Sequence, residues 1–99
     1  MATFAEGLAT RTAFELPQRI LRESLDDFVL VSDDEIRSAC LLMLERTRNL
    51  IEPAGASPLA AALRVRERLA GRCVGLVATG GNVSPAQLRE LLEVPSAGA

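Results

Sequence analysis

Two short motifs carry the residue types best suited to binding a small molecule. Thr79-Gly80-Gly81-Asn82 follows an apolar run, so its hydroxyl and glycines stand where open α/β sheets bind ligands, and glycine lets the backbone approach a planar ring or an anion closely. Upstream, Glu52 follows an apolar pair and precedes a proline, which favours a partly buried carboxylate that can interact with a ring or an amine. Thr79, Gly80, Gly81 and Glu52 are therefore candidate ligand-binding residues.

Each motif also has a simpler explanation. The segment from Thr79 to Asn82 is compatible with an ordinary strand-to-helix turn, and also with a phosphate cradle, because two glycines before a helix N-terminus make an anion site. Glu52 is compatible with a solvated loop acid, and Asn82 with a turn residue rather than a ligand contact. The residues alone leave these alternatives open.

The chain lacks two residue types on which much enzyme chemistry depends. It contains no histidine and no lysine, since all 11 basic residues are arginine. Without histidine, the usual general base, the usual zinc ligand and the Ser-His or Cys-His nucleophile pair are missing. Cys40 and Cys73 each stand alone in apolar surroundings, which predicts buried fillers rather than ligands or a disulfide. We therefore expect no metal site.

The charge pattern argues against a nucleic-acid partner. The 11 basic and 13 acidic residues are interspersed, the net charge is -2, and only 3% of the residues are aromatic and able to stack on bases. Arg64 and Arg68 share one face of a predicted helix while Arg66 points away, which indicates a solvated surface. The acidic cluster at 33–35 is better explained by helix capping than by metal binding.

Two further features concern the cellular compartment. No apolar run reaches the roughly 20 residues needed to cross a bilayer. The first residues also lack the basic stretch followed by an apolar one that marks secretion. We therefore expect a cytoplasmic protein without a membrane partner.

Capping signals predict where the helices begin. Ser32-Asp33-Asp34-Glu35 has the spacing of a capping box and opens a helix that should run to about Thr47, because apolar residues then recur at spacings of three and four. Ser57-Pro58 predicts a second helix that runs to about residue 70 and ends at Gly71. The segment 84–87 repeats the cap for a last helix, and a proline at 17 suits the first turn of an earlier one.

Two apolar runs, residues 28–31 and 73–78, predict strands, and the second resembles a strand covered on both faces. We therefore expect an α/β fold, a helix-rich and partial three-layer domain with a parallel sheet and two strands. It would span residues 1–99 as a single unit, with an irregular segment at 1–15 and a frayed tail at 94–99. Because two strands cannot form a stable covered sheet, the isolated chain should associate or aggregate.

Seven segments of the chain resemble one enzyme family in their order and spacing. The most specific pair is E-P-A-G-A at 52–56 followed by x-G-G-N at 79–82. From about residue 5 to residue 93, the chain resembles the C-terminal part of the catalytic domain of pyridoxal-phosphate-dependent threonine and serine dehydratases, which have serine racemase among their relatives. These are fold-type-II enzymes of the tryptophan-synthase β-subunit superfamily. The other matching segments are 6–9, 11–13, 27–29, 31–36 and 44–47.

The resemblance implies an ammonia-lyase that removes water and then ammonia from a hydroxy amino acid, leaves a 2-oxo acid, and uses pyridoxal phosphate as cofactor. It implies a hydrogen bond between the Thr79 hydroxyl and the pyridine nitrogen, with Glu52 near the ring. Relatives usually have serine where this chain has Thr79, a change that keeps the hydroxyl and adds a methyl group. A hydroxyl partner leaves the nitrogen unprotonated, and the milder electron sink suits β-elimination.

The resemblance also indicates which family parts this sequence lacks. The S-F-K-x-R-G motif, whose lysine holds the cofactor, and the glycine-rich phosphate loop have no counterpart. We therefore expect no catalytic residue on this chain, and weak or no binding of pyridoxal phosphate by the chain alone. The expected partner is the missing N-terminal half or another subunit. The alternatives are a non-catalytic remnant, a subunit-pairing fragment and a serine racemase-type relative.

Overall fold

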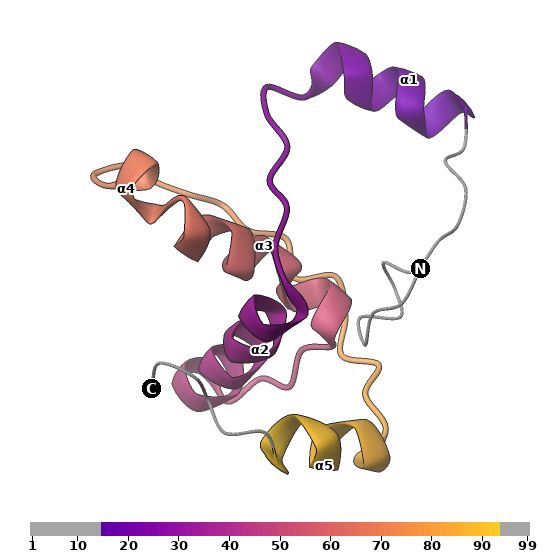
Figure 1. Cartoon of the computed structure of the whole chain (residues 1–99), viewed down its shortest axis with the longest axis vertical. Helices are drawn as coiled ribbons and strands as arrows, with labels where there is room; N and C mark the ends of the chain where they lie inside the picture. Colours follow the sequence, from indigo (N-terminus) through magenta and orange to yellow (C-terminus); the bar gives the residue numbers. More distant parts are fainter. Residues whose placement is uncertain (1–14, 94–99) are drawn as a thin grey trace.

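The computed structural model describes residues 15–93, which form five helices joined by turns and extended connections (Figure 1). Helices α2 and α3 pack together, α5 lies across one end of this pair, and α1 stands apart at the opposite end (Figure 1). The helices are α1 (Glu15–Ser24), α2 (Asp33–Thr47), α3 (Pro53–Arg64), α4 (Arg66–Leu69) and α5 (Pro85–Glu93).

Helix α2 begins and ends where the sequence predicts. The Ser32 hydroxyl accepts from the Glu35 N–H at 3.1 Å, and the Glu35 carboxylate accepts from the Ser32 N–H at 3.0 Å, which confirms the capping box. At the other end, Arg48 follows Thr47 in a left-handed conformation with φ 60°, and its N–H donates to the Leu44 carbonyl.

Helix α3 begins earlier than predicted. Pro53 is its first residue, so Ser57 and Pro58 lie inside the helix instead of starting it. Pro58 has no N–H for the Ala54 carbonyl, and the Ser57 hydroxyl donates to that carbonyl at 2.8 Å instead. This substitute hydrogen bond lets the helix continue through a proline.

The helix predicted to run to about residue 70 is interrupted at Val65, which separates α3 from α4. The end of α4 and the start of α5 follow the predicted signals. Gly71, with φ 77°, follows the short α4 in the left-handed conformation that glycine adopts easily. At α5, the Gln87 N–H donates to the Ser84 hydroxyl at 3.1 Å, and the Ser84 N–H donates to the Gln87 amide oxygen at 2.8 Å. The predicted cap at 84–87 is confirmed.

The core is small and is shared by α2, α3 and α5. The two longest helices meet through small side chains, so their backbones can approach closely. Val31, Leu41, Ile51, Leu59 and Leu88 pack around this centre as partly buried residues. The buried hydrophobic residues are Ile36, Ala39, Cys40, Ala56, Ala60 and Leu91.

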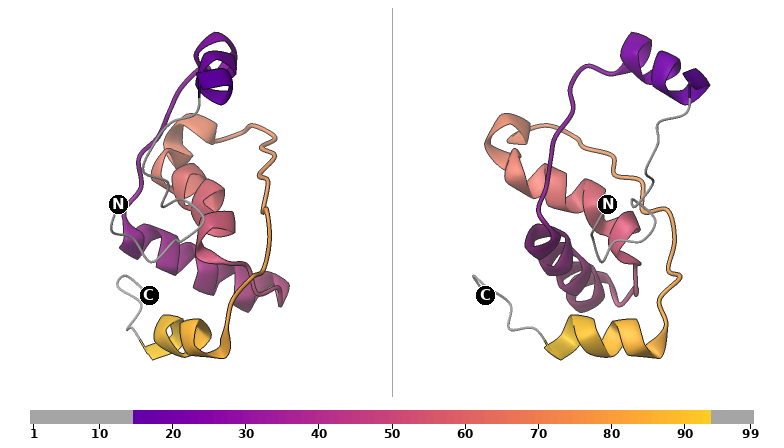
Figure 2. Two further views of the ribbon diagram at one scale, coloured as in Figure 1. Left: turned by 90° about the vertical axis from the view of Figure 1, so that its right-hand side faces the viewer. Right: turned by 45° about the vertical axis from the view of Figure 1, so that its right-hand side comes forward.

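Helix α1 packs against no other helix of the described residues, and none of its residues is buried. Its apolar side chains, among them Leu16 and Ile20, are exposed. Figure 2 shows α1 projecting beyond the other helices in both views. The radius of gyration, 14.3 Å, is accordingly larger than the roughly 13 Å of a compact domain of this length.

The predicted α/β fold with two strands is wrong for residues 15–93, which contain helices and no strand. Both apolar runs are extended, but neither forms a backbone ladder with another segment of the described residues. Figure 2 shows why they do not pair with each other: residues 25–32 and 73–84 run along opposite sides of α3. A strand requires hydrogen bonds to a second strand, so an apolar run can predict an extended chain without securing its partner.

Several expectations concern positions that the structure leaves undescribed. The predicted frayed tail at 94–99, and the predicted irregular segment at 1–15 apart from Glu15, lie outside the described residues. Two of the seven matching segments, 6–9 and 11–13, lie there as well. Those expectations stay predictions.

Candidate functional site

The structure brings the two predicted motifs together. The connection between α2 and α3 meets the extended segment that follows α4, and the Glu52 N–H donates to the Gly80 carbonyl at 3.0 Å. This hydrogen bond places Glu52, at the start of α3, directly beside Thr79-Gly80-Gly81. The four predicted site residues, Glu52 and the segment from Thr79 to Gly81, therefore lie in one place.

The glycines are required for this contact. A Cβ on Gly80 would lie 2.7 Å from Glu52 Oε1, and a Cβ on Gly81 would lie 2.6 Å from the Leu50 carbonyl oxygen. A Cβ on Gly55, in the first turn of α3, would lie 2.9 Å from Ile51 Cγ2 and 3.1 Å from the Gly80 carbonyl oxygen. At Gly81 the close atom belongs to the backbone, so a larger residue there would push the two segments apart, and at Gly55 the fit to the Gly80 carbonyl is tight. At Gly80 the close atom is the end of the Glu52 side chain, which a larger residue would displace.

The Glu52 carboxylate lies against the Gly80 backbone. The residue is partly buried, as the sequence pattern predicts, and its own carbonyl accepts from the Ala56 N–H at 3.1 Å. Within residues 15–93 its carboxylate forms neither a hydrogen bond nor an ion pair. The carboxylate is thus held in place by packing and keeps its acceptor positions available.

Thr79 is exposed next to this contact, and its hydroxyl forms no hydrogen bond with another described residue. It can therefore donate to, or accept from, a ligand. Asn82 is the middle residue of a tight turn in which the Val83 N–H donates to the Gly81 carbonyl at 2.8 Å. This geometry favours the interpretation of Asn82 as a turn residue.

The site offers the Thr79 hydroxyl and the Glu52 carboxylate next to a glycine backbone. Both groups can hydrogen-bond a flat polar ligand, but the chain has no lysine whose amine could hold a ligand covalently. Among residues 15–93, no three His, Cys, Asp or Glu side chains gather as a possible metal site. In the same residues, no helix combines the length and apolar character of a membrane span.

Comparison with known proteins identifies the family. A family model described as "Pyridoxal-phosphate dependent enzyme" matches residues 1–80. The chain belongs to this family. The resemblance inferred from the motifs is thereby confirmed, and pyridoxal phosphate is the cofactor of the family.

Ammonia-lyases are prominent among the relatives of this chain. An L-threo-3-hydroxyaspartate ammonia-lyase of Saccharomyces cerevisiae is 37% identical over 81 residues, which are 82% of this chain and 25% of the relative. An L-threonine ammonia-lyase of Geobacter sulfurreducens is 39% identical over 92 residues, 92% of this chain and 23% of the relative. A serine racemase of Dictyostelium discoideum is 37% identical over 91% of this chain and 28% of the relative. The chain thus spans about a quarter of the length of these relatives.

The contact between the motifs fits one end of the family's cofactor. The exposed Thr79 hydroxyl is a donor of the kind that a pyridine nitrogen accepts, and the exposed Gly81 presents backbone without a side chain. Nothing in the sequence supplies the amine that would hold the cofactor covalently. The fit is therefore to the nitrogen end of the ring.

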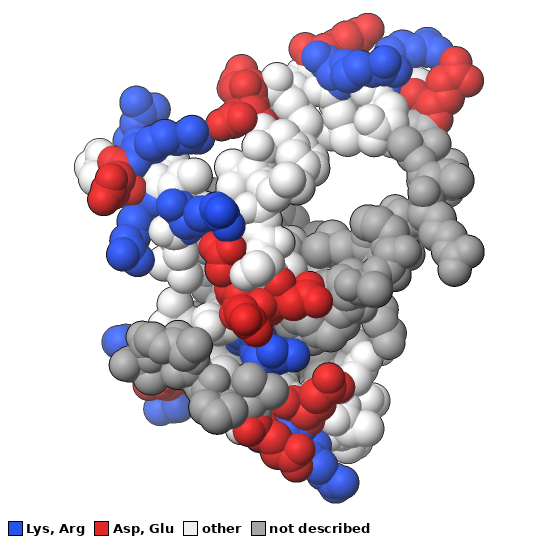
Figure 3. Space-filling view, viewed as in Figure 1, with Lys and Arg blue, Asp and Glu red and all other residues white. Residues whose placement is uncertain are grey.

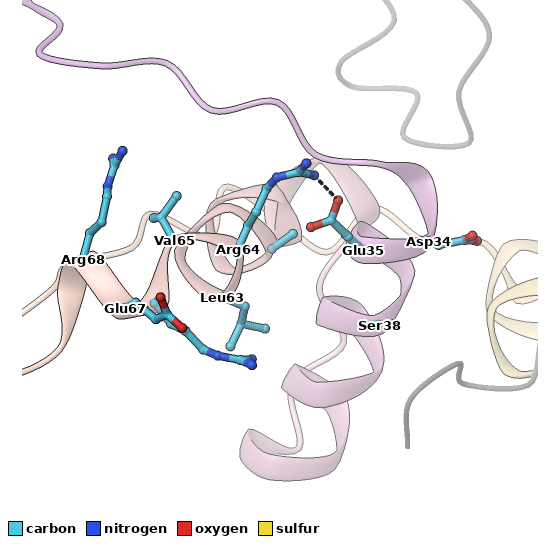
Figure 4. Close-up of a pocket in the computed structure, with 10 residues that line it drawn as sticks. Asp34, Glu35, Ser38, Leu63, Arg64, Val65, Glu67 and Arg68 are labelled. Atoms are coloured by element: carbon cyan, nitrogen blue, oxygen red, sulfur yellow. Dashed lines mark hydrogen bonds and ion pairs between the residues drawn. The ribbon is translucent and has the colours of Figure 1, made fainter.

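A separate surface groove lies between the start of α2 and the α3–α4 region. Arg64 reaches across it and donates to the Glu35 carboxylate (Figure 4). The Ser32 N–H, and then Arg64, hold the pKa of the Glu35 carboxyl below its ordinary value. Two of its charged side chains, Glu35 and Arg64, are therefore paired with each other across the groove.

A second ion pair ties the 25–32 connection to α4. Arg68 donates to Asp27 at 2.9 Å, and this bond, together with the Phe28 N–H, lowers the pKa of the Asp27 carboxyl. Sequence analysis missed both pairs, because each joins residues far apart in the chain and the only signal was the shared helical face of Arg64 and Arg68. Figure 3 shows acidic and basic side chains interspersed, without an extended face of one sign.

The two cysteines differ in their surroundings. Cys40 is fully buried between α2 and α3, as predicted, and burial raises the pKa of its thiol to about 11. Cys73 was also predicted to be a buried filler, which is wrong: it is exposed. It belongs to the apolar run that has no neighbouring strand, so nothing covers it.

Proposed function

We propose that this chain supplies the pyridine-nitrogen end of the cofactor site in a pyridoxal-phosphate-dependent ammonia-lyase that acts on a hydroxy amino acid. The observation that carries the proposal is the hydrogen bond from the Glu52 N–H to the Gly80 carbonyl. It joins the two motifs and sets the Thr79 hydroxyl and the Glu52 carboxylate around one glycine turn. The names of the ammonia-lyase relatives support the reaction class.

Each site residue has a distinct part in this proposal. Thr79 donates its hydroxyl hydrogen to the ring nitrogen, and Gly80 and Gly81 keep the backbone bare so that the ring can approach. Glu52 holds the turn through its N–H and presents a carboxylate beside the ring or the substrate amine. The bound cofactor supplies the electron sink at the substrate α-carbon.

The rest of the machinery belongs to the part of the relatives that this chain does not span. A lysine is required to hold the cofactor and to move the α-proton, and this chain has none. One hydrogen bond to the ring nitrogen contributes only about 1 kcal/mol. The chain alone should therefore bind pyridoxal phosphate weakly and catalyse nothing.

A racemase-type function is the second candidate, because the serine racemase of Dictyostelium discoideum matches this chain at the same 37% identity as the yeast ammonia-lyase. Both functions use the same ring-nitrogen contact. The product formed from L-serine distinguishes them: a racemase forms D-serine, and a lyase forms a 2-oxo acid and ammonia.

The test combines this chain with the yeast relative from which the region matching this chain has been deleted. Pyridoxal phosphate and L-threo-3-hydroxyaspartate are added, and 2-oxo acid formation is followed. Activity is expected only in the mixture. Thr79→Val should lower it about fivefold to tenfold, because one hydrogen bond is lost, while Thr79→Ser should retain it.

Three outcomes would contradict the proposal. No activity in any combination would favour a non-catalytic remnant or a subunit-pairing fragment. Equal activity of Thr79→Val and the unchanged chain would remove the role of the hydroxyl. Activity of the chain alone would overturn the argument from the missing lysine.

A further inference from the structure

We propose that helix α1 pairs with the α1 of a second copy of this chain, antiparallel and about a two-fold axis. Leu16 and Ile20 of each copy pack against a groove that lies beside α1 of the other copy. The candidate cofactor site takes no part in this contact, so the pairing does not depend on the proposed function.

The first reason is that α1 has an apolar face with no cover. Among the described residues, α1 contacts no other helix and none of its ten residues is buried. A helix of this length is marginal in water by itself, because most helical stability comes from packing an apolar face. Four apolar side chains at the spacing of one face are between 39% and 60% exposed, namely Leu16, Ile20, Leu21 and Leu25. This face therefore requires a partner.

The second reason is that the shape of this region is self-complementary. A groove of about 350 Å³ lies between the C-terminal half of α1 and residues 25–28, with an apolar lining of Leu21, Leu25 and Phe28. Leu16 and Ile20 belong to the other half of α1, outside the groove, and are exposed. In an antiparallel pair, the projecting half of each copy meets the groove of the other, so the same contact forms twice.

The third reason is charge complementarity between two copies. Arg19 and Glu23 lie one turn apart along the same edge of the apolar face. When Leu21 meets Leu21 of the second copy, Arg19 of each copy lies opposite Glu23 of the other, as in the edge pairs of coiled coils. Arg19 contacts Glu15 of its own helix at 3.3 Å, but both side chains are more than half exposed, so this contact can be exchanged.

These features favour a second copy over a different polypeptide. The projecting side chains, the groove and both charges lie on one element, so a copy of the chain supplies every complement at once. The contact is small, because two helices of ten residues bury less than the roughly 1,200 Å² of a specific, stable interface. We therefore expect a weak dimer whose population rises with concentration.

The experiment is sedimentation equilibrium of the full chain from about 10 µM to about 1 mM, which should show a reversible equilibrium between monomer and dimer. Arg19→Glu and Glu23→Arg should each raise the dissociation constant at least about fivefold, because like charges then meet across the pair. An equimolar mixture of these two variants should regain the affinity of the unchanged chain, since opposite charges meet again. Arg89→Glu, the same charge change on α5, is the matched control and should stay within about twofold.

A second pair of variants tests the apolar contact. Ile20→Ser should raise the dissociation constant at least about tenfold, because it removes an apolar side chain from the proposed interface. Leu92→Ser on α5 is the matched control, since Leu92 is 56% exposed and Ile20 is 52% exposed. Because α1 contacts no other helix of the described residues, Ile20→Ser should leave the urea unfolding of the α2–α3 pair unchanged.

Each contrary result overturns the pairing. A chain that stays monomeric over the whole concentration range would exclude it. Association that Arg19→Glu and Ile20→Ser leave unchanged would assign the contact to another surface, and a mixture of the charge variants that does not recover would exclude the antiparallel register. A monomeric chain that binds the yeast ammonia-lyase without its matching region, and loses this binding with Ile20→Ser, would assign the face to a different polypeptide.

Discussion

The α2–α3 pair and residues 73–78 are similarly rich in apolar side chains, but only the helix pair buries them. Ile36, Ala39 and Cys40 are buried at the contact of two helices, while the valines and the leucine of the extended segment stand in solvent. A helix satisfies its backbone within itself and needs only a second apolar face. An extended segment needs a neighbour for its backbone before its side chains can be covered.

This contrast shows that an apolar segment is buried only where its backbone N–H and C=O groups also have hydrogen-bond partners. Both regions border the candidate site, because Glu52 belongs to the helix pair and Thr79 to the extended segment. The Glu52 half of the site is therefore fixed by the core between α2 and α3. The Thr79 half depends on the turn at residues 79–82, which contacts residues 50–52. The following predictions test that difference.

The largest effect on the free energy of unfolding is expected from a substitution that removes buried side-chain atoms from the core. Ile36→Ala removes buried atoms and leaves a cavity, so the free energy of unfolding should fall by about 2–5 kcal/mol. The matched variant Leu30→Ala, at a residue 76% exposed, should change it by less than about 0.5 kcal/mol. Urea unfolding followed by helical circular dichroism measures both. Similar losses in the two variants would show that the extended region is buried after all.

Alkaline pH should weaken the helix pair through Cys40. The thiol has an ordinary pKa of 9.0 and a folded pKa of about 11, so its contribution is fully present below pH 9 and is lost as the pH rises toward 11. Between pH 8 and pH 10.5, the free energy of unfolding should fall by roughly 2 kcal/mol. Cys40→Ala should abolish this decline and Cys73→Ala should preserve it; an unchanged decline in Cys40→Ala would assign it to other groups.

The turn at residues 79–82 should be destabilised by the addition of one methyl group. Gly81→Ala places a Cβ against the Leu50 carbonyl oxygen and should destabilise the turn by about 1–2 kcal/mol. The hydrogen exchange of the Glu52 amide should then accelerate about tenfold. Gly75→Ala is the matched control, since a Cβ there meets no atom within 4 Å. Equal exchange in both variants would mean that the turn docks without needing glycine.

The smallest effect is expected at the cap of α2. Ser32→Ala removes the acceptor of the Glu35 N–H and should cost about 1 kcal/mol of unfolding free energy. Ser38→Ala, at an exposed position inside the same helix, should be neutral or slightly stabilising. Thermal unfolding compares the two variants. If Ser32→Ala is as stable as Ser38→Ala, the capping box contributes nothing measurable.

Local signals were sufficient to predict most of the helices. The caps at Ser32 and Ser84 act within one turn, so their outcome does not depend on the rest of the chain. The start of α3 was placed wrongly because Pro53 and Pro58 both suit a first turn, and the sequence does not show that the Ser57 hydroxyl would replace the lost backbone bond.

The parts that could not be predicted depend on distant neighbours. The two apolar runs were assigned to strands on composition, but strands are defined by partners that the run itself does not specify. The ion pairs of Glu35 and Asp27 join distant positions, and the shared helical face of Arg64 and Arg68 does not indicate which acids they contact. The meeting of Glu52 with Gly80 was expected only through the family resemblance, and the three glycines show physically why these segments fit.

The position of α3 between the two extended segments also has a kinetic consequence. Helices α2 and α3 are consecutive in the chain, so their contacts are local and should form on the microsecond to millisecond scale. The extended segments lie on opposite sides of this pair, and any strand pairing is non-local and slower (Figure 2). The Glu52 side of the site should thus be organised early in folding, and the Thr79 side should be added to it last.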